Sequence, residues 1–357
     1  MNSRERIENQ MNFLPVDHIP ILGGWFTSAA QYQHFAKISK DEFWNDPERG
    51  AILAYRNLKI DGLLGIGLPP DEHRYIDVTK ESFEKANISC PSPESVIDYV
   101  DKLPSPESLS DNFDSESFHK ETLEEMQQKQ EMLGEMVWMP ARFECCGNFM
   151  WYQTFGYESY LMALALYPDK MKKLFEFSAE EARLQNEVLA RVYNENNFCK
   201  LLLMGQDICG QKGPMVSVKF LEEVYFPLAK HAVKPLIEGG FKLIWHSDGN
   251  LMPIVDLVID IGVAGFQGFQ WEAGTTIDEI AKRKPKNDEK FIFFTGMSVT
   301  RTLPFGTTED VKKEINHCVS VTEGKGLFLM SSNTINPDAK TDNIRTAYEY
   351  ALTIGTC

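Results

Sequence analysis

Short apolar runs alternate with longer amphipathic stretches along most of this chain. The eight runs predicted as buried strands are Ile19–Gly24, Ile60–Gly67, Met136–Met139, Lys200–Met204, Leu243–His246, Gly265–Phe269, Phe291–Gly296 and Leu327–Met330. Between them, apolar residues recur every three or four positions, which is typical of helices with one buried face. The predicted helices are Phe43–Leu58, Ser117–Leu133, Tyr157–Asn194 with a break at Pro168, Val218–Glu238, Leu251–Ile261, Ile277–Lys282, Thr308–Thr322 and Asp338–Leu352.

Eight strands separated by helices predict an α/β protein, a single (β/α)8 TIM barrel spanning residues 1–357 with an N-terminal extension. An open doubly wound sheet is the competing architecture, but no GxGxxG motif follows the first strand. Four prolines lie among Ser, Asp and Glu between residues 88 and 116. They predict an acidic loop excursion that carries a short helix around Glu94–Leu103.

Composition narrows the function classes. The formal net charge of −16 argues against nucleic acids and anionic membranes as partners, since both attract basic surfaces. No apolar run approaches the roughly 20 residues of a membrane span, and the charged N-terminus does not resemble a signal peptide. Seven cysteines without a CxxC pair indicate reduced thiols. Together these features predict a cytoplasmic protein.

The strongest chemical signal lies where the fourth and fifth predicted strands end. Asp207 follows the fourth strand, while His246 ends the fifth and Asp248 follows it. In a barrel, the carboxyl ends of the strands form one rim, where active sites gather. Two carboxylates and an imidazole on that rim suit a divalent ion, with zinc favoured by the histidine. The alternative is structural: Asp207 caps its loop, and His246 pairs with Asp248 or a carbonyl.

Other polar residues near strand ends are weaker candidates for the site. Arg142 and Glu144 follow the third strand, as either an anion clamp that orients substrate or a simple ion pair. Gln267, Gln270 and Glu272 follow the sixth and could supply an amide- and carboxylate-rich pocket for a pterin cofactor. Cys145 and Cys209 are less favoured than His246 as candidate metal ligands, with buried core residues as the alternative.

Aromatic residues also gather near the predicted strand ends. Trp25, Phe149, Trp151 and Tyr152 either wall an aromatic pocket or fill the mouth of the barrel.

Several segments resemble the uroporphyrinogen decarboxylase superfamily, which includes the cobalamin-dependent methyltransferases. The resemblance runs nearly end to end and rests on Arg4–Ile7, Pro15–Pro20, Gly205–Asp207 with Gly213–Ser217, His246–Asn250 and Asn336–Ile344. His246-Ser-Asp248-Gly-Asn250 resembles the His-x-Cys-Gly-Asn zinc segment of methylcobamide methyltransferases. The segment is more similar still to the His/Asp-x-Asp-Gly-Asn pattern of methoxyaromatic O-demethylase methyltransferases. The resemblance also places Asn250 among the cofactor-binding candidates.

Two departures shape what the resemblance implies. Decarboxylases of this superfamily carry arginines after the first strand, whereas this chain has Gly23–Ser28 with no arginine. Asp61 matches the decarboxylase's catalytic aspartate, yet this chain lacks the arginines that bind the acidic tetrapyrrole substrate. Where the thiol-methylating branch has cysteine ligands, this chain has Asp248 and either Ser332 or Asn333. The resemblance therefore supports Asp207 and His246 best as metal ligands.

Three functions follow as hypotheses. The first is a zinc-assisted methyltransferase that moves a methyl group between two partners. One partner is a small substrate, such as a methoxylated aromatic, or tetrahydrofolate, and the other is a corrinoid carried by a partner protein. The second is a cofactor-independent decarboxylase of a smaller carboxylated substrate, in which Asp61 would be catalytic. The third is a barrel that binds a corrinoid or tetrapyrrole without chemistry.

Overall fold

Parallel strands form the centre of the molecule. The structure is a computed structural model that describes residues 1–69, 90–288 and 290–355. The strands are β1 Leu22–Gly23, β2 Gly62–Leu63, β3 Val137–Trp138, β4 Leu201–Gly205, β5 Cys209–Gly210, β6 Gly213–Pro214, β7 Lys242–His246, β8 Gly265–Gln267, β9 Ile292–Met297 and β10 Leu327–Ser331. Each of the eight predicted runs overlaps one of them, and among the described strands only the short β5–β6 hairpin was not predicted.

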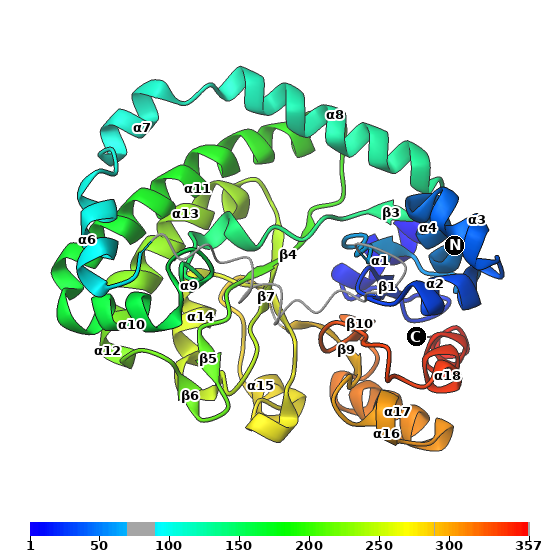
Figure 1. The fold of residues 1–357 in the computed structure, drawn as a ribbon. Coiled ribbons are helices and arrows are strands. Elements are labelled where there is room, and N and C mark those ends of the chain that lie inside the picture. Colours follow the sequence, from blue (N-terminus) through cyan, green and yellow to red (C-terminus); the bar gives the residue numbers. More distant parts are fainter. Residues whose placement is uncertain (70–89, 289, 356–357) are drawn as a thin grey trace.

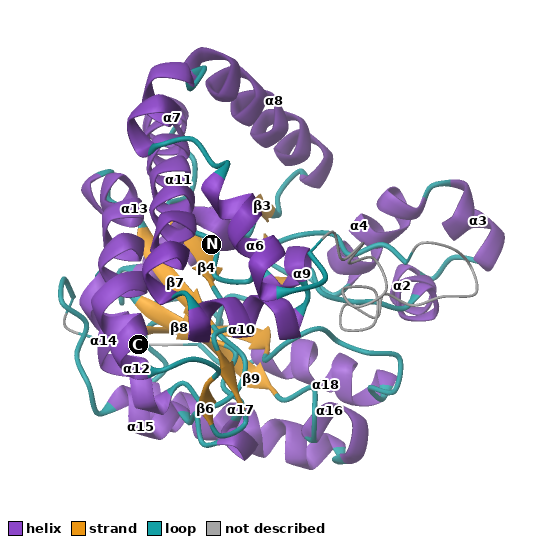
Figure 2. Ribbon diagram, turned by 60° about the vertical axis from the view of Figure 1, so that its left-hand side comes forward, coloured by secondary structure: helices purple, strands orange, loops and turns teal. Residues whose placement is uncertain are grey.

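Helices surround these strands on the outside (Figures 1 and 2). The α-helices are α1 Ser3–Met11, α2 Ala29–Ala36, α3 Lys40–Asn45, α4 Pro47–Asn57, α6 Pro93–Asp101, α7 Pro106–Asn112, α8 Ser115–Leu133, α9 Tyr152–Phe155, α10 Tyr157–Leu166, α11 Pro168–Asn196, α12 Val218–Phe220, α13 Phe226–Glu238, α14 Val255–Ile261, α15 Ile277–Ala281, α16 Thr302–Phe305, α17 Thr308–Thr322 and α18 Thr341–Ala351. Tighter turns are η1 Phe143–Cys146, η3 Met252–Ile254 and η4 Trp271–Ala273, and η2 Leu221–Tyr225 is a π-helical turn. In the described part of the chain, no helix is both long and apolar enough to cross a membrane.

The strands pair in chain order as two parallel sheets. One has the order β1-β2-β3, and the other the order β4-β7-β8-β9-β10. Two contacts join their edges. A parallel bridge pairs Ile21, next to β1, with Leu329 of β10. After β3, the backbone N–H of Arg142 donates to the carbonyl of Leu203 in β4 at 2.9 Å. The predicted α/β class with parallel strands in sequence order is confirmed.

Alternating side chains of the strands enter two different cores. One set, from all eight parallel strands or the residues beside them, forms an inner cluster that includes Leu203, Ile244, Phe294 and Met330. The other set packs outward against the helices in a larger cluster. Successive side chains of a strand point to opposite faces, so a strand buried on both faces must be apolar at nearly every position. That is why the eight runs could be recognised in the sequence.

One predicted helix is divided in the structure. The stretch predicted as one helix from Phe43 to Leu58 is two helices, α3 and α4. They divide at Asp46, which caps α4 by accepting a hydrogen bond from the Arg49 amide at 3.1 Å. The predicted break at Pro168 is confirmed between α10 and α11.

The short helix predicted around Glu94–Leu103 in the acidic excursion is confirmed as α6, and the described part of the excursion is more helical than predicted. Residues 93–101 and 106–112 form α6 and α7, and α8 begins at Ser115. Residues 88 and 89 lie outside the described residues. Pro93 and Pro106 each occupy the first position of a helix, directly after the capping side chains of Ser92 and Ser105. A proline at that position supports a helix, since its missing N–H would have had no partner.

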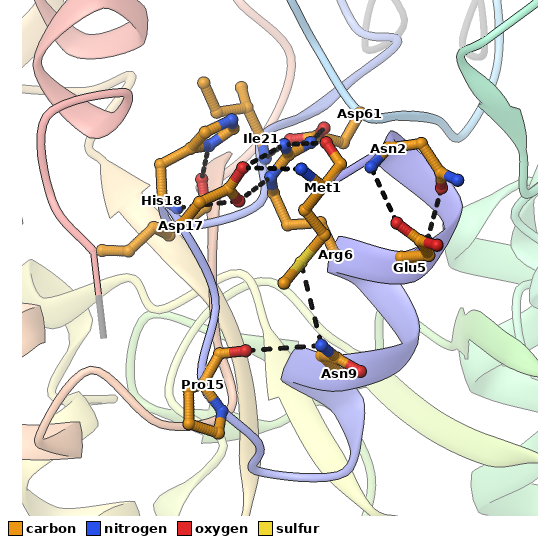
Figure 3. A network of polar contacts seen from close by, with 11 residues as sticks. Met1, Asn2, Glu5, Arg6, Asn9, Pro15, Asp17, His18, Ile21 and Asp61 are labelled. Carbon is orange, nitrogen blue, oxygen red and sulfur yellow. Dashed lines mark hydrogen bonds and ion pairs between the residues drawn. The ribbon is translucent and has the colours of Figure 1, made fainter. Parts of the chain in front are cut away.

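The N-terminal extension is a docked helix, not a loose tail. Ile7 of α1 is fully buried and joins the inner cluster. The Arg6 guanidinium binds Asp17 through two hydrogen bonds of 2.7 and 2.9 Å and also binds one oxygen of Asp61 (Figure 3). The other Asp61 oxygen accepts from the Ile21 amide at 2.9 Å. Helix α1 is thus held to the amino ends of the strands by an ion cluster.

Candidate metal centre and active site

A large cavity opens at the carboxyl ends of the parallel strands. Its volume is about 1690 Å³. Every parallel strand contributes at its end or in the following loop, through Trp25, Gly65, Phe143, Asp207, His246, Gln270, Val299 and Asn333. Small-molecule sites usually measure roughly 300–1,000 Å³, so this cavity has room for more than one small reactant.

Asp207, His246 and Asp248 meet in this cavity as predicted. His246 Nε2 lies 3.5 Å from Asp207 Oδ1 and 3.9 Å from Asp248 Oδ1. One ligand atom from each residue lies within 4.8 Å of the others, and no cysteine of the described chain belongs to the group. Ligands held about 2.0–2.1 Å from a tetrahedral zinc ion lie roughly 3.3 Å apart. The donors fit a catalytic-type zinc site with three protein ligands and an open position.

Gln267 sets the orientation of the histidine. Its side-chain nitrogen donates to the carbonyls of Ser331 and Ser332 at 2.8 and 3.1 Å. Its side-chain oxygen therefore faces His246 Nδ1, to which it is hydrogen-bonded. Because an amide oxygen only accepts, Nδ1 is the ring nitrogen that carries the proton in this contact, which leaves Nε2, on the side of the two carboxylates, as the atom that can bind an ion. This arrangement is typical of metal-binding histidines, whose second nitrogen is held by a neighbour.

The two carboxylates are held by neutral donors. Asp207 Oδ1 accepts the Asp248 amide at 2.9 Å, and the Asp248 carboxylate accepts from Asn333 Nδ2 at 2.9 and 2.7 Å. Burial raises the pKa of the Asp248 carboxyl above its ordinary value. The nearby His246 ring opposes the rise, and the Asp207 charge adds to it. Carboxylates in such a setting gain stability when a cation enters between them.

A glycine allows β4 and β7 to deliver these residues side by side. Gly205 is the last residue of β4, is paired with His246 of β7, and has a φ of +138°. A Cβ atom at position 205 would lie 2.1 Å from the carbonyl oxygen of His246. Only glycine fits this conformation and this close approach. The chain then turns so that Asp207 comes to the side of the imidazole.

Arg142 and Glu144 do not join the cluster. Arg142 pairs with Glu125 of α8 at 2.7 Å, outside the parallel strands, and Glu144 is exposed. The predicted alternative of an ion pair between Arg142 and Glu144 is therefore wrong, because packing of α8 brings Glu125 to the guanidinium. Neither residue lines the cavity.

Asp61 lies away from the cavity. It directly precedes β2, while the loop after β2 lines the cavity through Gly65 and Gly67. Both of its oxygens are engaged, one by Arg6 and the other by the amide of Ile21. The structure therefore places Asp61 at the amino ends of the strands, in a buried ion cluster.

The remaining candidates divide between cavity and scaffold. Gln270 lines the cavity, and its side-chain oxygen accepts the Gly249 amide at 2.7 Å. Asn250 accepts the Met252 amide at 3.1 Å and does not line the cavity. Cys209 does line it, but burial raises the pKa of its thiol to about 12, so it is a neutral thiol. Cys145 is buried, and burial raises the pKa of its thiol as well.

Two kinds of residue contribute to the site without having been predicted from the sequence. One is Gln206, which is buried and bridges two loops: its nitrogen donates to the Phe143 carbonyl at 2.6 Å and its oxygen accepts the Phe149 amide at 2.7 Å. The other comprises Tyr157 and Glu158 at the start of α10, which line the cavity. No local signal marks these residues, because only the packing of α10 over the strand ends brings them there.

Comparisons with known proteins give a fold but no family. No protein-family model matches the chain, and no curated protein is similar to it in sequence. A methyltransferase from Methanosarcina mazei has a similar structure, with a TM-score of 0.60 and 15% identity, over 99% of this chain and 98% of that chain. The two proteins therefore share a fold over nearly their whole lengths.

A second solved structure is less similar. It is a candidate vitamin-B12-independent methionine synthase from Listeria monocytogenes, with a TM-score of 0.41 and 14% identity over 64% of this chain and 68% of that chain. That score is too low to support a conclusion about this chain.

Proposed function

We propose that this chain is a metal-assisted methyltransferase, a single (β/α)8 barrel domain over residues 1–357. It would move a methyl group between a small substrate and a corrinoid carried by a partner protein, with tetrahydrofolate as the alternative reactant. The observation that carries the proposal is the group of Asp207, His246 and Asp248 at the base of the 1690 Å³ cavity. The shared fold with a methyltransferase and the resemblance of the His246–Asn250 segment agree with it.

The proposed roles follow from the contacts. Asp207, His246 and Asp248 would hold zinc, and Gln267 would keep His246 Nε2 turned toward it. The ion would supply a Lewis acid for the heteroatom that loses its methyl group. The volume of the cavity supports the idea that part of a second, bulky reactant enters beside the substrate.

The arrangement favours methyl transfer over decarboxylation. A decarboxylase would need Asp61 beside its substrate, yet both oxygens of Asp61 are engaged at the amino ends of the strands. The polar groups that converge in the cavity are a potential metal site instead. A pure binding protein would need the same pocket but would return its ligand unchanged.

Metal analysis of the purified protein tests this proposal. We expect about one zinc per chain in the wild type, since three donors and an open position make one catalytic-type site. His246→Ala should lose both the zinc and methyl transfer to a free reduced corrinoid. His231→Ala is the matched control, because His231 is an exposed histidine of α13 outside the cavity. Equal zinc content in wild type and His246→Ala would refute the proposed metal centre. Turnover of a carboxylated substrate that survives both a chelator and His246→Ala would favour a decarboxylase.

A further inference from the structure

The loop of residues 332–335 follows β10 and reaches the proposed metal centre. Both ends of this loop are held by neighbouring strands. The Ser332 amide donates to the carbonyl of Met297 at the end of β9 at 2.8 Å, and the Ile335 amide donates to the carbonyl of Trp25 after β1 at 2.8 Å. A side chain on a loop that is held at both ends has a defined place, which the orientation of a metal ligand requires.

Ser332 belongs to the scaffold of the site. Its hydroxyl accepts the Val299 amide at 3.2 Å, and its carbonyl accepts from Gln267 Nε2 at 3.1 Å. The Ser332 hydroxyl therefore faces the loop after β9. The sequence left the choice between Ser332 and Asn333 open, and the structure shows that Asn333 contacts the metal cluster through its side chain.

A neighbouring threonine fixes the orientation of the Asn333 amide. The side-chain oxygen of Asn333 accepts from the backbone amide and the hydroxyl of Thr334, at 2.6 and 3.0 Å. Since an amide oxygen accepts and an amide nitrogen only donates, these contacts leave Nδ2 to face Asp248. Nδ2 lies 2.9 Å from Asp248 Oδ1 and 2.7 Å from Asp248 Oδ2. Asn333 therefore offers Asp248 a donor, while its own oxygen is engaged by Thr334.

The two distances determine how Asp248 can bind an ion. A nitrogen at nearly equal distances from both oxygens of a carboxylate lies between them, on the side away from the carboxyl carbon. A metal ion bound through both oxygens would occupy that same place. With Asn333 there, Asp248 can bind an ion through one oxygen only, and its Oδ1 lies 3.9 Å from His246 Nε2.

This restriction has a consequence for the proposed zinc ion. A tetrahedral ion that takes one atom each from Asp207, His246 and Asp248 has one coordination position left. A second oxygen from Asp248 would compete for that position. Building on the proposed function, we propose that Asn333 is a positioning residue that limits Asp248 to one oxygen and thereby keeps the fourth position of the ion open for the heteroatom of the methyl donor.

Cobalt in place of zinc tests the inference on the full chain without a corrinoid. The visible absorption of Co²⁺ reports its coordination, because a four-coordinate ion absorbs more strongly than a five-coordinate one. We expect the four-coordinate spectrum for the wild type. Asn333→Leu keeps a side chain of similar size but removes the donor, so both oxygens of Asp248 become free to bind and the absorption should weaken. Asn333→Ala should give the same change without a bulky side chain.

Titration with azide measures whether the fourth position is open. Azide is a small anion that binds metal ions, so it should change the Co²⁺ spectrum of the wild type. Its affinity should fall roughly tenfold in Asn333→Leu, the lower end of the usual effect of removing a group that orients a metal ligand. Asn336→Leu is the matched control, because Asn336 is an exposed asparagine of the same loop region whose backbone carbonyl contacts Gln31. Its spectrum and its azide affinity should equal those of the wild type.

The outcomes separate this inference from the proposed function. Unchanged absorption and azide affinity in both Asn333 variants would overturn the role of Asn333 and leave the metal centre standing. A five-coordinate spectrum in the wild type, or loss of Co²⁺ from both variants, would contradict the restriction to one oxygen. Equal Co²⁺ content in wild type and His246→Ala would refute the metal centre itself, and this inference with it.

Discussion

The two ends of the parallel strands carry similar sets of residues with different partners. At the amino ends, Asp17 and Asp61 share Arg6, a permanent cation. At the carboxyl ends, Asp207 and Asp248 share His246, an imidazole whose Nε2 faces them. In both sets, two carboxylates converge on one nitrogen-bearing side chain. The chemical difference is that arginine stays charged, whereas a neutral imidazole offers a lone pair.

That difference separates a structural cluster from a candidate site. The Arg6 cluster is complete without any ligand, since the guanidinium donates to both carboxylates and to the Met1 carbonyl. The three residues of the His246 cluster include no permanently charged cation, so a metal ion bound there would supply the positive charge that Arg6 supplies at the other end. The side chain of Asp61 is 2% exposed, while that of Asp207 is 35% exposed and lines the cavity. The cluster at the amino ends of the strands holds α1 in place, whereas the cluster at the carboxyl ends is open to a ligand.

Arg6→Met gives the largest expected effect. It leaves the buried Asp61 carboxylate without its cation, which should cost about 3–5 kcal/mol of unfolding free energy. Denaturant unfolding measures the loss. Arg345→Met is the control, because the Arg345–Asp342 pair is exposed and should contribute about 1 kcal/mol or less. Zinc content of folded Arg6→Met should equal that of wild type. A loss of unfolding free energy below about 1 kcal/mol in Arg6→Met would mean that Arg6 contributes no more than an exposed ion pair.

Zinc added to stripped protein should raise the unfolding free energy. The expected gain is about 2.7 kcal/mol at a free concentration 100 times the dissociation constant. His246→Ala should gain far less, since one ligand is missing. Thermal unfolding with and without zinc measures both. Equal stabilisation of the two proteins would show that zinc binds elsewhere.

Gln267→Met tests the orientation of the histidine. It removes the hydrogen bond to His246 Nδ1 while keeping the length of the side chain. Zinc affinity should fall about 10–100-fold, the usual effect of removing a group that orients a metal ligand. Competition with a chelating dye measures it. Gln270→Met is the control, because its oxygen accepts from the Gly249 amide and it contacts no member of the cluster directly. Unchanged zinc affinity in Gln267→Met would show that this bond has no role.

The smallest effect concerns acid. The Arg6 guanidinium lowers the pKa of Asp17 well below its ordinary value. A carboxyl with a lowered pKa stabilises the fold above its unfolded pKa of about 3.9 and loses that contribution as pH falls toward the folded pKa. Wild type should exceed Asp17→Asn by about 1 kcal/mol or less at pH 7, since Asp17 is 43% exposed. The difference should shrink below about pH 4. Denaturant unfolding at pH 7, 5 and 3 measures it, and a difference independent of pH would contradict this account.

Most of the scaffold could be predicted because its signals are local. Runs such as Lys200–Met204 and Leu243–His246 are apolar at nearly every position, as strands buried on both faces must be. The break at Pro168 is equally local. The helix around Glu94–Leu103 was predicted, but α7 was not, because proline and serine favour both loops and helix starts. Only the folded structure shows that Ser105 and Pro106 begin a helix.

Part of the candidate site could also be predicted. Asp207, His246 and Asp248 stand where strands end, and parallel strands bring their carboxyl ends together. The partners of other charged residues could not be predicted. Arg142 is two positions from Glu144 in sequence, yet it pairs with Glu125 of α8. An ion pair depends on which elements pack side by side, and nearness along the chain does not determine that.

The sequence alone determined where the strands run. It also determined that an aspartate follows one strand and that a histidine ends another. Each of these features depends on residues only a few positions apart in the chain. The tertiary structure decided which carboxylates received a permanent cation. It brought Arg6 to Asp61 across 55 positions and placed Gln267 behind His246 across 21. A charged side chain pairs with groups that lie within a few ångströms of it in space. Only the tertiary structure could therefore distinguish the amino ends of the strands, where Arg6 pairs with the carboxylates, from the carboxyl ends, which are open to a ligand.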